Sequence, residues 1–108
     1  MTILLHHVSL LTRDPERSAE FYQSIFGLRR LERPPFKIEG VWLDCGPSLQ
    51  LHLTKHLPGN FRSAGVDNND CHFAFRTDDF EGILARLVAA GFREHAADRN
   101  IIEVNTAA

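Results

Sequence analysis

Five polar residues lie at alternating positions of strand-like segments and carry donor atoms that divalent metals prefer. They are His7, Gln50, His52, His72 and Glu103. Because successive side chains of a strand point to opposite faces, each is expected to face away from its apolar neighbours. Neutral imidazoles and a carboxylate bind Zn, Ni, Mn or Fe(II), and two histidines with one carboxylate leave positions open for water or substrate. One face of the predicted sheet therefore has the chemistry of a catalytic metal site.

Other polar and aromatic residues have weaker support as site residues. A single strand histidine is more often a hydrogen-bonded core or surface residue than a ligand, and His6, His56 and His95 are expected to be surface or packing residues. Arg76 shares the predicted face of His72 and could meet an anionic substrate, although a solvent-facing strand end is the simpler interpretation. Trp42 is a candidate wall of a substrate pocket.

The first half of the chain predicts a strand, a helix and three further strands. An apolar segment at 3–11 predicts the first strand. Asp14 followed by Pro15 predicts the start of a helix, and Gly27 predicts its end. The three further strands are predicted at residues 28–33, 41–45 and 49–54.

The second half repeats the same order of signals. A strand at 71–76 leads into a helix that Asp78 and Glu81 are expected to cap and that Gly91 is expected to end. A last strand is predicted at 101–106, where Glu103 aligns with Gln50. Compared with the first half, the second half lacks about one strand.

The repeat makes two of the histidines equivalent. His7 and His72 are 65 residues apart, and Gly27 and Gly91 are 64 apart, which favours ligand roles for both histidines. The segment 56–69 is rich in Gly, Pro, Asn and Ser and is predicted to link a first module, 1–55, to a second, 70–108, within one structural domain.

Composition excludes several classes of protein. The chain has 108 residues, 44% hydrophobic and 24% charged, which is typical of one soluble globular domain. A net charge of −2 without a basic cluster argues against nucleic-acid or membrane-surface partners. No apolar run is long enough to span a bilayer, and the N-terminus lacks the features of a signal peptide. Cys45 and Cys71 have no framework spacing and are expected to be reduced thiols, which favours a cytoplasmic location.

Four stretches of the chain resemble the vicinal oxygen chelate superfamily. They are LHHVSLLTRDPERSAEFYQSIFGLRRLERP, GVWLDCGPSLQLHL, NDCHFAFRTDDFEGILARLVAAGF and NIIEVNT, and they cover most of the sequence. The superfamily includes glyoxalase I, methylmalonyl-CoA epimerase, fosfomycin-resistance proteins, extradiol dioxygenases and bleomycin-resistance proteins. Within the superfamily, the sequence most resembles glyoxalase I-like proteins. The resemblance implies an α+β fold in which paired βαβββ modules form a U-shaped mixed sheet around a divalent metal, with the helices on the outer face.

The resemblance also implies roles for individual residues. His7 matches the ligand of the first strand, His72 the ligand that opens the second module, and Glu103 the glutamate of the last strand. Gln50 matches the fourth ligand, and His52, which faces the same way, is the alternative. Glu103 would in addition move a proton next to a substrate carbonyl. The residues 95–100 stand where relatives carry a further strand and turn. The loss of that strand predicts an open pocket, a homodimer with strand exchange, or a degenerate protein.

The function implied by the resemblance is a small metal-dependent enzyme. The metal would bind two vicinal oxygens of a small-molecule substrate and stabilise an enolate or oxyanion, as in a lyase or isomerase. Fe(II) in the same site would suit a dioxygenase. One alternative is a metal-free small-molecule-binding protein of the bleomycin-resistance type, and another is a degenerate dimerising domain. A homodimer is expected because the missing strand leaves a sheet edge exposed.

Overall fold

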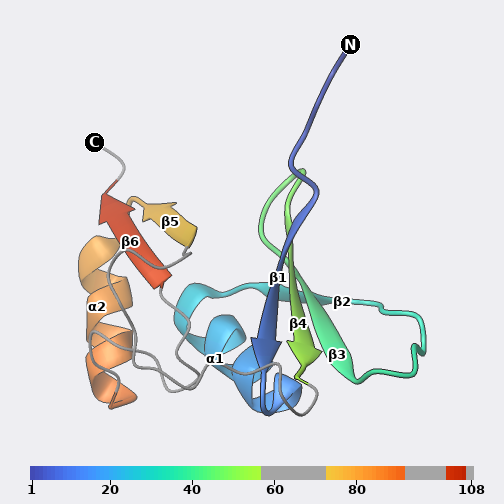
Figure 1. Cartoon of the computed structure of the whole chain (residues 1–108). Helices are drawn as coiled ribbons and strands as arrows, with labels where there is room; N and C mark the ends of the chain where they lie inside the picture. The colour runs from blue at the N-terminus through green and yellow to red at the C-terminus, as the bar shows by residue number, and fades with distance from the viewer. Residues whose placement is uncertain (57–72, 92–101, 107–108) are drawn as a thin grey trace, which may run out of the picture. The chain divides into compact units, whose positions relative to one another are not determined.

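A computed structural model describes residues 1–56 and 73–91 and the backbone of residues 102–106 (Figure 1). The chain divides into two compact units, a first unit Met1–Phe61 and a second unit Arg62–Ala108. The predicted linker, 56–69, lies outside the described residues apart from His56. Neither helix within the described part of the chain is long and apolar enough to cross a membrane.

The first unit is one helix packed against a mixed four-stranded sheet. Its elements are β1 (His7–Thr12), α1 (Pro15–Phe26), β2 (Arg29–Leu31), β3 (Gly40–Asp44) and β4 (Gln50–Lys55). The strand order is β1-β4-β3-β2, with β1 parallel to β4 and the other neighbours antiparallel. This arrangement confirms the βαβββ module predicted for the first half of the chain.

The ends of α1 follow local rules. The Asp14 carboxylate accepts a hydrogen bond from the Arg17 backbone amide at 3.1 Å, and Pro15 occupies the first turn. Gly27 ends the helix with φ of +69°, a left-handed conformation that glycine adopts without the steric penalty of a Cβ.

One face of this sheet is apolar and packs against α1. Its strands contribute Val41, Leu43, Leu51 and Leu53, each at most 1% exposed. Figure 1 shows α1 lying against the sheet, and its contacts are with β2, β3 and β4. The helix contributes its own buried stripe of Ala19, Tyr22 and Ile25. Burial of these side chains holds the sheet face against the helix and leaves the opposite face to polar residues.

The second unit contains β5 (Phe73–Thr77), α2 (Phe80–Ala89) and β6 (Ile102–Thr106). β5 and β6 pair in parallel, as β1 and β4 do in the first unit. α2 packs against β6. The parallel pairing of the first strand with a later strand is therefore common to both units.

The same capping arrangement recurs 65 residues along the chain. The Thr12 hydroxyl accepts from the Asp14 amide at 3.3 Å, and the Thr77 hydroxyl accepts from the Asp79 amide at 2.9 Å. Asp79 then accepts from the Gly82 amide at 3.1 Å, as Asp14 does from Arg17. Repetition of the hydrogen bonds at a constant offset supports the internal repeat more strongly than the residue identities do.

Three predicted boundaries are wrong. The strand predicted at residues 28–33 ends at Leu31. The first strand begins at His7 rather than at residue 3, because β4, its partner, begins at Gln50 and offers no hydrogen-bonding edge to Ile3 or Leu4, which are exposed. The cap of α2 is Asp79 rather than Asp78, since Asp79 is the residue whose side chain reaches the Gly82 amide.

Candidate functional site

The polar face of the first sheet brings together His7, Gln50, His52 and Trp42. In the parallel register His7 lies opposite Gln50, and in the antiparallel register Trp42 lies opposite His52. Directly paired residues project to the same face of a sheet, and residues two apart on one strand also share a face. Strand alternation predicted this common face for His7, Gln50 and His52, and the register confirms it.

The rings on this face form a continuous stack across three strands. The His7 and His52 ring centroids are 4.0 Å apart with an interplanar angle of 12°, and those of His52 and Trp42 are 4.4 Å apart at 9°. Phe36 extends the row at 6.1 Å from Trp42. His52 is sandwiched between two rings and is 9% exposed, whereas His7 is exposed.

Two hydrogen bonds orient the donors of this cluster. His52 Nε2 lies 2.8 Å from Gln50 Oε1. Because an amide oxygen can only accept, Nε2 carries the proton and donates. His6 Nδ1 lies 2.8 Å from His7 Nδ1, so one of these two nitrogens donates to the other.

His6 is a member of the cluster that strand alternation missed. It precedes β1, so the two-residue periodicity of a strand does not govern its direction. Its ring centroid lies 5.1 Å from that of His7 and 6.4 Å from that of His52. His6 is exposed, as expected of a surface residue, and in addition it contacts His7. The sequence feature that could have identified His6 as a member of the cluster is its position directly before His7.

The environment keeps His52 neutral. Burial lowers the pKa of His52 from 6.5 to about 4, and the nearby charges of His7, His6 and Arg33 act in the same direction. A neutral imidazole is the form that ligates a metal or orients a neighbouring ligand. At neutral pH His52 therefore presents an uncharged imidazole.

Among the described residues, no group of three or more His, Cys, Asp or Glu side chains is arranged to hold a metal ion. His72 lies outside the described residues, as do Cys71 and His95. Glu103 lies in β6, whose backbone alone is described, and is paired in register with Ala74. The predicted roles of His72 and Glu103 as ligands remain predictions, as does the substrate contact of Arg76 in β5.

Strand register places Glu103 differently from the sequence alignment. Ala74 is the counterpart of Ser9 at the offset of 65, and Ser9 lies opposite His52 while Ala74 lies opposite Glu103. Glu103 therefore corresponds to His52 rather than to Gln50. A shift of two residues keeps the same face of the strand, which is why alternation alone did not distinguish the two alignments.

Cys45 does not contribute a thiolate to this region. It is a free, half-buried cysteine directly after β3. Burial raises the pKa of Cys45 to about 11, and the negative charge of Asp44 adds to this effect. The thiol is therefore protonated at neutral pH, which makes Cys45 a poor nucleophile and a poor metal ligand.

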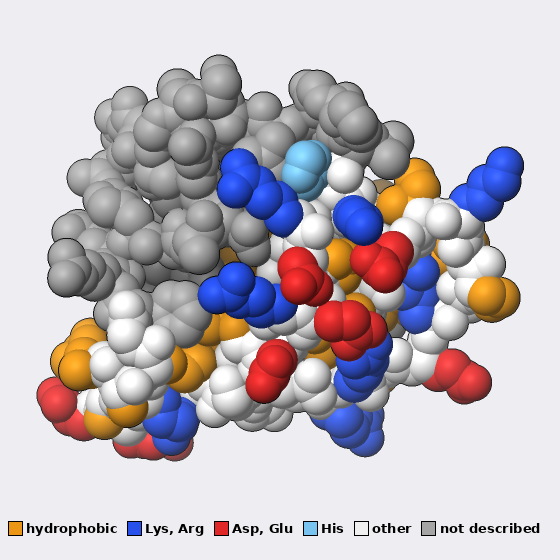
Figure 2. Space-filling model, turned by 90° about the horizontal axis from the view of Figure 1, so that it is seen from below, with side chains coloured by type: hydrophobic (Ala, Val, Ile, Leu, Met, Phe, Trp, Pro, Cys, Tyr) orange, Lys and Arg blue, Asp and Glu red, His pale blue; other side chains and the backbone are white. Residues whose placement is uncertain are grey.

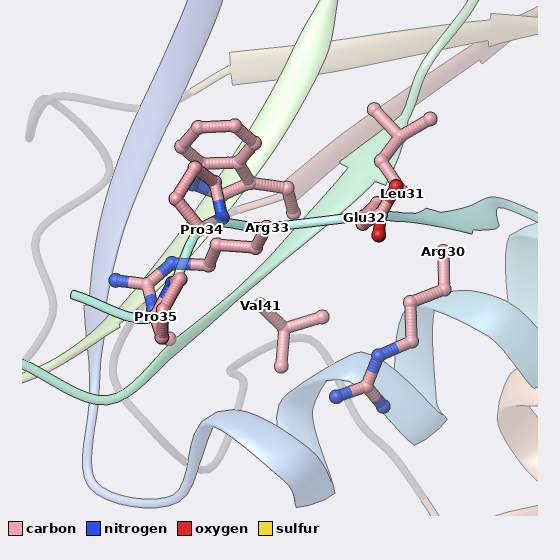
Figure 3. A pocket seen from close by; sticks show the side chains of 9 residues that line it. Arg30, Leu31, Glu32, Arg33, Pro34, Pro35 and Val41 are labelled. Atoms are coloured by element: carbon pink, nitrogen blue, oxygen red, sulfur yellow. The ribbon is translucent and has the colours of Figure 1, made fainter.

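A cavity of about 520 Å³ lies where the chain leaves β2 and returns into β3 (Figure 3). Residues 30–35 and 40–42 line it, including Trp42 of the ring stack. Arg30, at one side, donates to the Glu16 carboxylate at 2.7 Å, and this hydrogen bond lowers the pKa of Glu16. Arg33 is the second cation of the lining. Sequence reasoning did not single out Arg33, because its position in the space next to Trp42 depends on the path of the connection between the strands.

Acidic and basic side chains are interspersed on the face of the molecule shown in Figure 2. Ion pairs on the first unit join Arg29 to Asp44 at 3.0 Å and Lys55 to Glu39 at 3.9 Å.

Comparison with solved structures shows the fold. FosX, a fosfomycin resistance protein from Mesorhizobium loti, matches with a TM-score of 0.79 at 18% identity, over 100% of this chain and 94% of that one. FosX from Listeria monocytogenes, in complex with Mn(II) and sulfate, matches with a TM-score of 0.74 at 17% identity, over 100% and 94% of the two chains. The trypanothione-dependent glyoxalase I of Leishmania major matches with a TM-score of 0.71 at 21% identity, over 97% and 87%.

Sequence comparison points to the same family. Glyoxylase I 4 of Arabidopsis thaliana is 29% identical over 93 residues, which are 81% of this chain and 51% of the relative. The chain thus spans about half the length of that relative. The family model of the Glyoxalase/Bleomycin resistance protein/Dioxygenase superfamily matches residues 4–99. These matches confirm the resemblance noted in the sequence: the chain belongs to the Glyoxalase/Bleomycin resistance protein/Dioxygenase superfamily.

Proposed function

We propose that the protein is a small divalent-metal-dependent enzyme that acts on a small-molecule substrate as a lyase or isomerase. The observation that carries this proposal is the cluster of His7, Gln50 and His52 on the polar face of the first sheet, held by the 2.8 Å contact between His52 and Gln50. A bound divalent ion would supply Lewis acidity toward two neighbouring oxygens of the substrate.

The donors of the first unit fit such an ion. His7 and Gln50 lie directly opposite each other on adjacent strands. We assign Gln50 rather than His52 as the ligand, because the Nε2 proton of His52 is already donated to Gln50 Oε1. His52 then orients the amide, and His6 orients His7 through the Nδ1 contact; hydrogen-bonded partners of this kind commonly fix metal ligands.

The remaining ligands of the proposed site are His72 and Glu103 of the second unit. His72 is the repeat counterpart of His7, and Glu103 is the register counterpart of His52. A carboxylate is also the group that can take a proton from a carbon next to a carbonyl, which is the role proposed for Glu103. Zn, Ni and Mn suit a lyase or isomerase with this donor set, and Fe(II) would suit a dioxygenase.

Metal analysis tests the proposal directly. Protein stripped with a chelator, reloaded with each metal in turn and desalted should retain about one equivalent of one of them. The double variant His7→Ala/His72→Ala should retain less than about a tenth of that. His56→Ala, a histidine outside the cluster, is the matched control and should bind like the wild type. Equal metal content in the wild type and the double variant would refute the proposed site.

A metal-free binding protein is the second candidate, favoured by the cavity beside Trp42. Anything that binds only the folded state raises its stability. A ligand that raises the melting temperature equally with and without chelator would support this candidate against the enzyme. A ligand that stabilises only the metal-loaded protein would support the enzyme.

A further inference from the structure

Arg33 lies on the polar face of the first sheet, at the end of the ring stack away from His7. A Cβ built on Gly40 would come within 3.0 Å of the Arg33 guanidinium carbon and of one of its terminal nitrogens. Gly40 pairs with Thr54 in the same register that places Trp42 opposite His52, so its missing side chain belongs to that polar face. The absence of a Cβ at Gly40 is what lets the guanidinium rest on the sheet.

The guanidinium is held between this backbone and an aromatic ring. Its central carbon lies 5.0 Å from the ring centroid of Phe36, in cation–π range. One terminal nitrogen donates to the Ile38 carbonyl at 2.8 Å. These contacts fix the position of the cation, so little side-chain entropy remains to be lost when a ligand binds.

The positive charge of Arg33 has no carboxylate partner within the described part of the chain. The ion pairs there use Arg29, Arg30 and Lys55 instead. Arg33 Nε is buried and has no hydrogen-bond acceptor among the same residues. A buried donor without an acceptor is destabilising, because it has lost its hydrogen bonds to water. An acceptor that carries negative charge would satisfy both the donor and the cation.

The cavity provides space for such a group. Arg33, Pro34 and Trp42 all line it. Glu32, the acidic residue of the lining, points away from the Arg33 guanidinium, and Arg30 extends toward α1 (Figure 3). Arg33 is therefore the one cation of this lining that is not neutralised by a described carboxylate. Phe36, whose ring centroid lies 5.0 Å from the guanidinium carbon, is 56% exposed.

We propose that this cavity binds the carboxylate of a small substrate whose flat apolar part lies against Trp42, with Arg33 as the carboxylate receptor. Planar carboxylates match the fork of N–H groups on a guanidinium, and the part of the Trp42 side chain that lines the cavity suits an unsaturated or aromatic group. The inference deepens the proposed function, since it names the class of substrate for the same polar face.

Benzoate is the probe, and chelator-treated protein is the sample, so that the result does not depend on the metal. Trp42 is the only tryptophan of the chain and lines this cavity, so its fluorescence, measured at constant pH, responds to a ligand bound there. Benzoate should change Trp42 emission in a saturable way, whereas benzamide, the neutral analogue, should bind at least tenfold more weakly. Equal binding of benzoate and benzamide would overturn the proposal.

Two variants separate the carboxylate receptor from a purely structural arginine. Arg33→Gln should weaken benzoate binding at least tenfold. Arg33→Lys keeps the charge but loses the planar fork, so its affinity for benzoate should lie between those of Arg33→Gln and the wild type. Arg29→Gln is the control, because it removes an exposed ion pair between β2 and β3, and it should bind benzoate like the wild type. Unchanged benzoate affinity in folded Arg33→Gln would show that Arg33 only anchors the loop to Ile38. If Arg33→Gln does not fold, the wild-type comparison of benzoate with benzamide decides.

The metal site and the carboxylate site fail separately in this design. His7→Ala should lose metal and still bind benzoate without metal. If the wild type retains metal after reloading but binds benzoate and benzamide equally, the carboxylate receptor is overturned and the proposed enzyme stands. If the wild type prefers benzoate but retains no metal after reloading, the proposed enzyme is overturned and the carboxylate receptor stands.

Discussion

The imidazole of His52 lies parallel to the indole of Trp42, with ring centroids 4.4 Å apart and 9° between the planes. The two residues are directly paired across β3 and β4. A buried, neutral imidazole is thus in contact with the only tryptophan of the chain. The fluorescence of Trp42 consequently reports the protonation state of His52.

In metal-free protein, Trp42 emission should change as the pH falls through about 4 rather than through 6.5. Burial and the charges around it lower the pKa of His52 to about 4, and a protonated imidazole stacked on the indole alters its emission. The variant His52→Gln should lack this transition. A midpoint near 6.5 in the wild type would contradict the buried environment of His52.

The same lowered pKa makes the free energy of unfolding depend on pH. Above pH 6.5 His52 is neutral in both states and has no effect. Between pH 6.5 and about 4 the unfolded state binds a proton that the folded state does not, so stability falls as the pH falls, by at most about 3 kcal/mol, and levels off below pH 4. Urea unfolding of wild type and His52→Gln at several pH values should show this extra slope in the wild type only.

His6→Ala should weaken metal binding about 10- to 100-fold without abolishing it. Its Nδ1 contact with His7 at 2.8 Å orients the proposed ligand, and loss of such an outer hydrogen bond typically has an effect of this size. Titration of metal into the stripped protein, compared with His56→Ala, measures it. Affinity equal to that of His56→Ala would show that His6 does not support the ligand.

Leu43→Ala should destabilise the first unit by about 2–5 kcal/mol, because Leu43 is completely buried on the face that packs against α1. Leu84→Ala, at a position 44% exposed, should change the free energy of unfolding by no more than about 0.5 kcal/mol. Chemical denaturation of both variants tests the assignment of the apolar face. Similar losses in the two would mean that Leu43 does not belong to a core.

Asp14→Ala and Asp79→Ala should each cost about 1 kcal/mol, since each removes the acceptor of an N-terminal amide of its helix. Asp14→Asn and Asp79→Asn should restore most of the loss, because asparagine caps equally well. Asp78→Ala is the matched control for the second helix. A larger effect at Asp78 than at Asp79 would contradict the repeated cap.

Several features of this protein follow from local chemistry and could be predicted without a structure. The Asp14-Pro15 start and the Gly27 end of α1 depend only on backbone amides and on φ. The common face of His7, Gln50 and His52 depends only on the two-residue period of a strand. Family membership likewise follows from stretches of sequence that cover most of the chain.

Only the tertiary structure decided which of these residues meet. The register of β4 between β1 and β3 stacks His52 on both His7 and Trp42, and the period of two is equally compatible with a shift by two residues. His6 joins the cluster although it lies outside the strand, and Arg33 rests on Gly40 because the chain returns past it into β3. Side-chain alternation is a property of one strand, whereas contacts between strands depend on hydrogen-bond register and on loop paths, which the local sequence does not encode.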